Sequence, residues 1–486
     1  MAELVHDAGL CDLTARDLAS ALASGRVSAT EVLEAHLRRI DERNGALTAV
    51  VSLDPDGARQ RARAADDARS AGHHLGPLHG VPMTLKDGND VAGLRTTIGT
   101  HELDHVPSAD GTVAKRLRAA GANIVGHTNV AAWLADHQSA NPVFGRTSNP
   151  WDTSRTAGGS SGGAAAAVAS GMSSVDVGSD MVGSLRQPAS FCGVYALKPT
   201  EHRVPLTGFF RTPDAGPRPV RIMVSLGPVT RSLEDLELLL SLISGPDGLD
   251  SDVAAVPFEH RPDTASAALR LAVARTIPGA PVAKVLRDRV DQVAGAVADA
   301  GGVVEEALPD ISWDAQAALY GELLQTLTTV FSPGGGSPPT LARHLELLDT
   351  RDKIIAAWER FFDRYGALLM PPAATVAYPH SDGRTPLEID GGRMPYQEQG
   401  LVFALSNLNG LPGLVMPAGL DPDGMPAGIQ LVGARWREPV LLAIGRGLES
   451  AGVTPGFQAP PTPKDSVSPT AARPPLPAGI SAPTSA

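Results

Sequence analysis

The sequence predicts a single large α/β domain, and two observations support this fold class. Segments with the apolar pattern of strands alternate with amphipathic helical segments along nearly the whole chain, without an internal repeat. The chain has 486 residues, 43% hydrophobic and 19% charged, which is enough for a large buried core. We therefore expect one domain over residues 1–457. Pro, Ala, Ser and Thr dominate residues 458–486, which predicts a disordered tail.

The N-terminal part begins with three predicted helices, over 14–24, 29–43 and 56–70. Ser28 and Glu31 have the spacing of a capping box at the start of the second helix. A short apolar strand over 81–85 follows and ends at Lys86. Function is often found at the end of a buried strand, although a solvated lysine would also suit this position. Lys86 is therefore a candidate functional residue.

The rest of the chain continues the alternation of strands and helices. A helix over 112–120 leads into a strand over 122–125, and Ser232 with Asp235 forms another capping pattern before a helix that ends at 243. Loops are expected over 126–152, 332–339 and 378–395, where turn-forming residues are frequent. The other predicted helices cover 164–170, 282–300, 315–330, 352–364, 402–408 and 439–450, and the other predicted strands cover 174–178, 226–230, 269–274, 303–306, 367–370, 414–417 and 428–432.

Composition and charge narrow the classes of function. The formal net charge is −12, which argues against a partner with a phosphate backbone. The two cysteines, Cys11 and Cys192, cannot form a disulfide framework, and this fits a reducing compartment. We find neither the pattern of a signal peptide nor an apolar run of about 18 residues. We therefore expect a cytoplasmic protein with no membrane and no nucleic-acid partner.

The segment from His101 to His105 spells His-Glu-Leu-Asp-His, the pattern of zinc peptidases. Such a pair of histidines binds one metal ion only on a helix, where residues four apart share a face. Thr96, Thr97 and Thr100 precede this segment and Pro107 follows it, and none of these favours a helix. We expect a loop here and no metal site, and we keep a zinc peptidase as a remote alternative.

Two glycine-preceded serines, Ser160 and Ser184, lie 24 residues apart in the most unusual stretch of the chain. The first lies in Gly-Gly-Ser-Ser-Gly-Gly, which could be a flexible linker, but these glycines run directly into an alanine-rich helix. An anion-binding loop is weakly supported, because the phosphate-loop pattern is absent. A nucleophile elbow at Ser160 lacks a preceding buried strand and a suitable later histidine.

A third interpretation uses both serines together with Lys86. A serine hydroxyl needs a base within hydrogen-bonding reach before it becomes a good nucleophile. Lysine can act as that base only when it is neutral, and burial can lower its pKa from about 10.4 by several units. One serine would then relay the proton of the other serine to the lysine.

Taken together, these segments resemble the amidase signature family. The resemblance rests on the Gly-Gly-Ser-Ser-Gly-Gly run, on Gly-Ser-Asp-Met-Val-Gly-Ser-Leu-Arg-Gln-Pro over 178–188, and on Gly-Val-Pro-Met-Thr-Leu-Lys-Asp over 80–87. Asn-Pro-Trp-Asp over 149–152 and Gly-Ile-Gln-Leu-Val-Gly over 428–433 extend it over most of the chain. The family resemblance implies a central mixed β-sheet covered by helices on both faces.

The resemblance also implies roles for individual residues. Ser184 would be the nucleophile, Ser160 the bridging serine after a cis peptide bond, and Lys86 the general base. Backbone N–H groups of Met181, Val182, Gly183 and Ser184 would form the oxyanion hole. The backbone of Leu134 would face the substrate, and Asp180 and Arg186 would support the loop. Val182 departs from the family, which usually has a second glycine there.

The implied activity is hydrolysis of a carboxamide, without a metal or cofactor, by a monomer or homodimer. Carbamates and aryl esters present the same carbonyl geometry, so a urethane or ester hydrolase is the nearest alternative. The family also includes one component of a tRNA-dependent amidotransferase, which works inside a complex. The acidic net charge argues against tRNA contact. The sequence leaves the substrate open.

Overall fold

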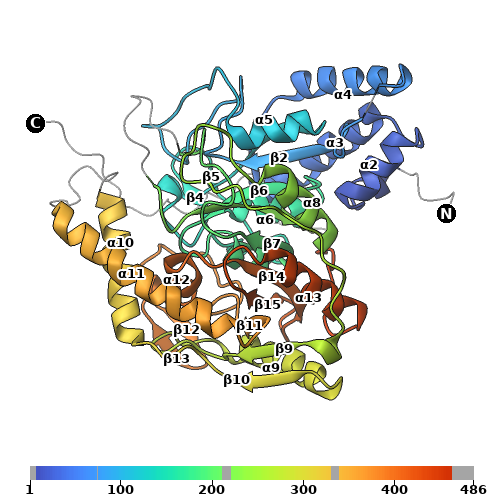
Figure 1. Ribbon diagram of the computed structural model, residues 1–486. Coiled ribbons are helices and arrows are strands. Elements are labelled where there is room, and N and C mark those ends of the chain that lie inside the picture. Colours follow the sequence, from blue (N-terminus) through green and yellow to red (C-terminus); the bar gives the residue numbers. More distant parts are fainter. Residues whose placement is uncertain (1–6, 74, 211–219, 330–338, 462–486) are drawn as a thin grey trace, which may run out of the picture.

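The computed structural model describes residues 7–73, 75–210, 220–329 and 339–461, and Figure 1 shows how their helices and strands are arranged. Two sheets organise these parts of the chain, one of eight strands and one of three. Two short hairpins accompany them. The larger sheet contains β6 (Asp176–Asp180), β7 (Tyr195–Lys198), β8 (Ser225–Thr230), β9 (Arg270–Val273), β10 (Val303–Glu306), β11 (Ala367–Met370), β14 (Gly413–Leu420) and β15 (Pro426–Val432); the smaller contains β1 (Val50–Leu53), β2 (Pro82–Lys86) and β3 (Asn123–Thr128); the hairpins are β4 (Ala140–Asn141) with β5 (Gly145–Arg146) and β12 (Leu387–Ile389) with β13 (Gly392–Met394).

The larger sheet is mixed, with the strand order β10-β9-β11-β15-β14-β7-β8-β6. Its β10, β9 and β11 strands run parallel to one another, and the remaining neighbours pair antiparallel. In the smaller sheet β3 is central, parallel to β2 and antiparallel to β1. The small sheet adjoins the β6 edge of the large sheet, where the backbone N–H of Thr84 donates to the carbonyl of Val175 at 3.4 Å.

Helices cover both faces of the large sheet, as alternate residues of β14 show. Gly413 faces the side chain of Arg186 in α7, whereas Leu414 and Met416 face Gly445 in α13. Because neighbouring residues of a strand point to opposite faces, α7 and α13 lie on opposite sides. The prediction of one large α/β domain with a mixed sheet between helical layers is thus confirmed.

The helical elements include the capping features expected from the sequence. Ser28 accepts from the backbone of Glu31 while the Glu31 side chain accepts from the backbone of Ser28, so the capping box is present. Ser232 likewise accepts from the N–H of Asp235. The helices are α1 (Asp7–Leu10), α2 (Ala15–Ala23), α3 (Ala29–Leu47), α4 (Pro55–Ser70), α5 (Thr112–Ala119), α6 (Gly162–Ala169), α7 (Arg186–Cys192), α8 (Leu233–Ile243), α9 (Lys284–Asp299), α10 (Trp313–Thr329), α11 (Leu341–Phe362), α12 (Leu401–Leu408) and α13 (Glu438–Ser450), with short 3-10 turns η1 (Ala132–Leu134), η2 (Ser266–Ala268) and η3 (Tyr396–Gly400).

Some predicted boundaries were wrong. The helix expected over 352–364 begins at Leu341, because Thr340 caps it by accepting from the N–H of Arg343. The segment 378–395 is not entirely loop, since β12 and β13 form a hairpin within it. Helix α7 and strands β1 and β7 were missed, because their apolar patterns are too short to stand out from the surrounding residues.

Several expectations fall on residues that the structure does not describe. The loop expected over 332–339 lies almost entirely outside the described residues, and so does the tail beyond 461. The domain boundary at 457 therefore stays a prediction. In the parts of the chain that the structure does describe, no helix combines the length and the apolarity needed to cross a lipid bilayer.

Candidate active site

The candidate site lies where the two sheets meet, at the carboxyl end of β2. Lys86 is the last residue of this strand, at the strand end where the sequence analysis placed it. All five residues of β2 are buried, and Lys86 pairs in register with Thr128 of β3. The strand thus places the Lys86 side chain inside the protein, beside β6.

Lys86 contacts two serine hydroxyls inside the protein. Its Nζ lies 2.7 Å from Oγ of Ser160 and 2.9 Å from Oγ of Ser179. Burial lowers the pKa of Lys86 to about 7, although the carboxylates of Asp180, Asp176 and Asp87 oppose this shift. A neutral amine has one lone pair and two N–H donors, so it can accept from one hydroxyl while it donates to the other.

Ser160 lies in the loop that leads into α6, and its peptide bond with Gly159 is cis, as the family resemblance implied. The carbonyl of Ser160 accepts from the hydroxyl of Ser139 at 3.0 Å. Helix α6 packs closely under β3, since a Cβ on Gly163 would lie 2.3 Å from the backbone nitrogen of Asn129. This close approach requires glycine and fixes the Ser160 loop beside Lys86.

Ser184 lies in the loop between β6 and α7 and is the most accessible of the three predicted residues. Lys86 is 0% exposed, Ser160 1% and Ser184 8%. The N–H of Ser161 donates to the carbonyl of Ser184 at 3.1 Å, so the two serine loops are in direct contact. The Ser184 hydroxyl has no hydrogen-bond partner among the described residues, and catalytic hydrogen bonds often tighten only when substrate is bound. The structure thus brings all three predicted side chains into one region.

The loop 181–184 offers backbone donors next to Ser184. Within the described chain, the N–H groups of Met181, Val182 and Ser184 have no acceptor at hydrogen-bonding distance. The N–H of Gly183 differs, because it donates to the Asp180 carboxylate at 2.9 Å. Three of the four expected N–H donors therefore remain available to a ligand, whereas the N–H of Gly183 is already bonded to Asp180.

Gly183 has a different role, which is conformational. Its φ is 84°, a left-handed conformation that favours glycine, and a Cβ there would lie 2.3 Å from Cγ of Phe403.

Val182 keeps a negative φ, so the loop tolerates a β-branched residue at the position where the family usually has glycine. Leu134 has a positive φ of 57° in the turn η1, an uncommon conformation for a large side chain.

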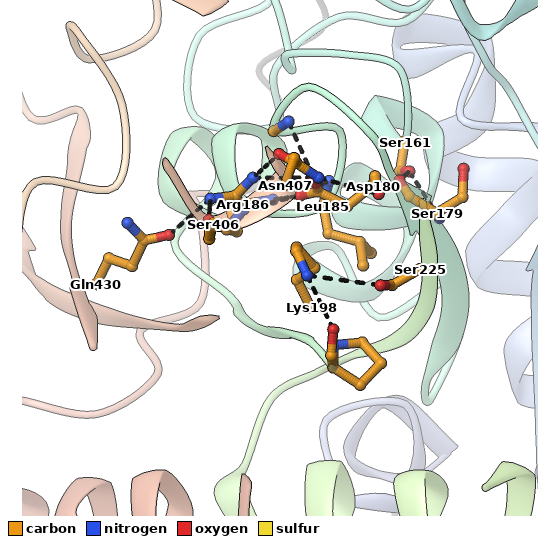
Figure 2. A network of polar contacts seen from close by, with 12 residues as sticks. Ser161, Ser179, Asp180, Leu185, Arg186, Lys198, Ser225, Ser406, Asn407 and Gln430 are labelled. Carbon is orange, nitrogen blue, oxygen red and sulfur yellow. Dashed lines mark hydrogen bonds and ion pairs between the residues drawn. The ribbon is translucent and has the colours of Figure 1, made fainter. Parts of the chain in front are cut away.

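An ion pair beneath the loop holds it in place (Figure 2). Arg186 donates to both carboxylate oxygens of Asp180, at 2.9 and 3.0 Å, and both side chains are 0% exposed. Burial disfavours the charged Asp180, but the Arg186 guanidinium outweighs it and keeps the pKa of this carboxyl well below its usual range. Arg186 also bonds to Ser406 and Asn407 of α12, which ties the loop to a distant part of the chain.

A second buried lysine lies close to this ion pair but not to the serines of the site. Burial, together with the nearby charge of Arg186, lowers the pKa of Lys198 to about 7. Its Nζ donates to the carbonyl of Pro199 at 2.9 Å and contacts Ser225 at 3.5 Å (Figure 2). Burial alone therefore does not distinguish the two lysines, whereas the contact with Ser160 does.

The His101–His105 segment forms turns and not a helix. His105 bonds to the carbonyl of Leu103 and to the carboxylate of Asp90, at 2.8 and 3.2 Å. Among the described residues, no group of three or more His, Cys, Asp or Glu side chains could hold a metal ion. This geometry gives the zinc-peptidase alternative no support.

Two polar residues near Lys86 were not identified from the sequence. Ser179 directly precedes Asp180 in the Gly-Ser-Asp run, so its position beside the predicted loop was the only available clue. Asp176 begins β6 and is 0% exposed, and an acid within a short apolar strand could have drawn attention to it. Neither contact can be found without knowing that β2 and β6 lie side by side.

The chain is similar to known proteins over most of its length. A model of the family described as Amidase matches residues 31–332 and 339–442. One component of the Glutamyl-tRNA(Gln) amidotransferase of Moorella thermoacetica is 33% identical, over 90% of this chain and 96% of that protein. The Putative amidase AmiB2 of Mycobacterium bovis is 34% identical, over 88% of this chain and 94% of that protein. A solved bacterial aryl acylamidase of the amidase signature enzymes superposes with a TM-score of 0.77 at 25% identity, over 91% of this chain and 96% of that one.

Proposed function

The chain belongs to the amidase signature family, and from this membership we propose that it hydrolyses carboxamide C–N bonds through an acyl-enzyme on Ser184. The observation that carries the proposal is the 2.7 Å contact between Nζ of Lys86 and Oγ of Ser160. A buried lysine with a pKa near 7 can accept a proton at neutral pH. Ser160 lies against this lysine, and the N–H of the next residue, Ser161, donates to the carbonyl of Ser184.

In the acylation step, Oγ of Ser184 attacks the carbonyl carbon while its proton passes to Ser160, whose own proton passes to Lys86. The carbonyl oxygen becomes an oxyanion, which the N–H groups of Met181, Val182 and Ser184 are available to bind. Donors fixed in place before the reaction are worth about 3 kcal/mol each. When the intermediate collapses, the C–N bond breaks and the amine leaves with the proton returned through Ser160.

The deacylation step uses the same groups in the same order. A water molecule attacks the acyl carbon and transfers a proton through Ser160 to Lys86. The C–O bond to Ser184 then breaks, the serine regains a proton from the same relay, and the carboxylic acid leaves. The balance is one amide and one water consumed, and one acid and one amine produced.

Substitution of each residue tests this assignment. Ser184→Ala should abolish turnover of a small anilide, because no acyl acceptor remains. Lys86→Ala should lower turnover nearly as much. Ser160→Ala should retain more activity than Ser184→Ala, since the nucleophile is still present. His101→Ala is the matched control and should keep wild-type activity with or without a chelator. Full activity in Ser184→Ala would refute the proposal.

Carbamates and aryl esters remain the nearest alternative substrates. Both contain a carbonyl carbon that Ser184 would attack and a carbonyl oxygen that the same N–H donors would bind. Rates on an anilide, a carbamate and an ester with matched acyl and leaving groups distinguish these activities. An amidase should show the highest kcat/KM on the anilide relative to the spontaneous rate of each substrate.

A component of an amidotransferase complex is the second candidate, favoured by the similarity to the Moorella thermoacetica protein. Our proposal is a hydrolase that acts on a small molecule and needs no nucleic acid, and the net charge of −12 supports this. Turnover of simple amides by the purified chain alone, unaffected by tRNA, is the expected result. Co-purification with stoichiometric partner proteins would favour the amidotransferase.

A further inference from the structure

Asp176 lies inside the protein with an incompletely bonded carboxylate. The residue is 0% exposed, and its Oδ2 accepts from the hydroxyls of Thr84 at 2.5 Å and Thr128 at 3.1 Å. Its Oδ1 has no hydrogen-bond partner among the described residues. Leaving a buried polar atom without a partner costs free energy, so this oxygen calls for an explanation.

The two threonines place the Asp176 carboxylate next to Lys86. Thr84 precedes Lys86 by two residues on β2, so both side chains leave the same face of the strand. Thr128 is the residue of β3 that pairs in register with Lys86. The carboxylate thus bonds to the nearest same-face neighbour and to the cross-strand neighbour of the lysine.

The other carboxylates that act on Lys86 are already bonded on both oxygens. Asp180 is paired with Arg186. Asp87 accepts from the N–H and the hydroxyl of Thr97, one at each oxygen, and its charge also acts on the buried His127. Asp176 differs from both, because it has no cationic partner among the described residues and keeps one oxygen free.

We propose that Asp176 is the counter-charge of Lys86, and that it stabilises the ammonium formed when Lys86 takes the proton of Ser184 through Ser160. This inference rests on the proposed function. Asp176 is a positioning residue, because it acts through Lys86 and touches neither substrate nor the reacting atoms. Burial raises the pKa of Asp176 to about 6, and the charge of Lys86 opposes this rise. In turn, the Asp176 carboxylate opposes the lowering of the Lys86 pKa, so each charge stabilises the other.

Asp176→Asn tests the proposal, because it removes the charge and keeps the shape. Without the negative charge the ammonium is less stable, so Lys86 deprotonates at lower pH. The acid limb of the kcat/KM profile should move down by about one pH unit, and kcat on the alkaline plateau should fall about tenfold. A limb that stays in place while only KM or thermal stability changes would overturn the proposal.

Asp235→Asn is the matched control. Asp235 lies on helix α8, far from Lys86 in the sequence, and is also 0% exposed. Its carboxylate accepts from the N–H groups of Ala15 and Arg16. This variant should lose stability, because it weakens the start of α2, and should keep the wild-type position of the acid limb.

A measurement without turnover covers the case in which Asp176→Asn does not fold. In Lys86→Met the carboxyl loses its cation and should keep its proton at neutral pH, which gives the infrared C=O band of a protonated acid. The band should be missing from Lys86→Met/Asp176→Asn, in which both charges are removed together. Identical spectra for these two variants would contradict the proposal, whatever the outcome of the Ser184→Ala test.

Discussion

At the scale of single residues, the proposed mechanism depends on the protonation of one lysine. Lys86 ends a strand whose five residues are all buried, and burial lowers its pKa from the ordinary 10.5 to about 7. Only the neutral amine can accept a proton from Ser160. In the proposed mechanism, burial within β2 makes Lys86 a base, and the 2.7 Å contact directs this base to the hydroxyl of Ser160.

The pH dependence follows from this pKa. Because activity needs neutral Lys86, kcat/KM for an uncharged anilide should rise as the pH increases through about 7 and then level off. The profile should be recorded from about pH 5 to about pH 9 with substrate well below KM. A limb near 10.5, the ordinary pKa of lysine, would show that Lys86 is charged at neutral pH and is not the base.

The two residues before Ser184 should respond very differently to substitution. Val182→Gly should keep kcat/KM within about tenfold, because Val182 has a negative φ that glycine also adopts. Gly183→Ala should lower it by at least about 100-fold, since the left-handed φ and the ring of Phe403 exclude a Cβ and displace the neighbouring donors. Steady-state kinetics on one anilide compares both variants, and equal losses would contradict this account.

Lys86, Ser160 and Ser184 could be predicted from the sequence because each lies in a short run with unusual composition. Ser179 and Asp176 could not, because their positions near Lys86 arise from the contact between β2 and β6 and not from local sequence. The occupied N–H of Gly183 was also unpredictable, since it depends on where the Asp180 carboxylate points.

At the scale of elements, the loop 181–184 depends on the ion pair beneath it. Asp180 ends β6 and accepts from the N–H groups of Gly183 and Leu185, so it shapes the loop directly. Arg186 begins α7 and connects the loop to Ser406 and Asn407 of α12. The neighbouring elements β6 and α7, together with α12 from a distant part of the sequence, thus set the position of Ser184, the proposed nucleophile.

Arg186→Met should therefore affect both stability and activity. It leaves the Asp180 charge buried without a partner, which should lower the free energy of unfolding by about 3–5 kcal/mol. Urea denaturation followed by circular dichroism measures this change. The control is Lys284→Ala, which breaks an exposed ion pair with Asp288 on α9. This variant should leave the urea concentration at the unfolding midpoint unchanged. Equal midpoints for both variants would show that the buried pair is not needed.

Element types were easier to predict than element ends. Long periodic segments such as α3 and α9 were recognised from their apolar spacing, and the capping box located the start of α3. Helix α11 was predicted to start about eleven residues too late, because its first three turns contain few buried residues. Short buried elements such as α7 and β7 have no periodicity to recognise.

At the scale of the whole molecule, the site requires both sheets. Lys86 belongs to the small sheet, Ser184 follows a strand of the large sheet, and Ser160 precedes helix α6, which packs against strands of both sheets (Figure 1). The alternation of elements predicted the α/β class, but the junction between the sheets depends on tertiary packing that no local pattern encodes. The family relationship, over residues 31–332 and 339–442, covers every residue of the proposed site.

The central claim, acyl transfer to Ser184, can be tested directly by trapping the covalent intermediate. The wild-type enzyme is mixed with an activated aryl ester, quenched in acid, and examined by intact mass and peptide mapping. We predict one added acyl group on Ser184, none in Ser184→Ala, and slower labelling in Ser160→Ala and Lys86→Ala. An acyl group mapped to Ser160, or wild-type labelling in Ser184→Ala, would contradict the mechanism.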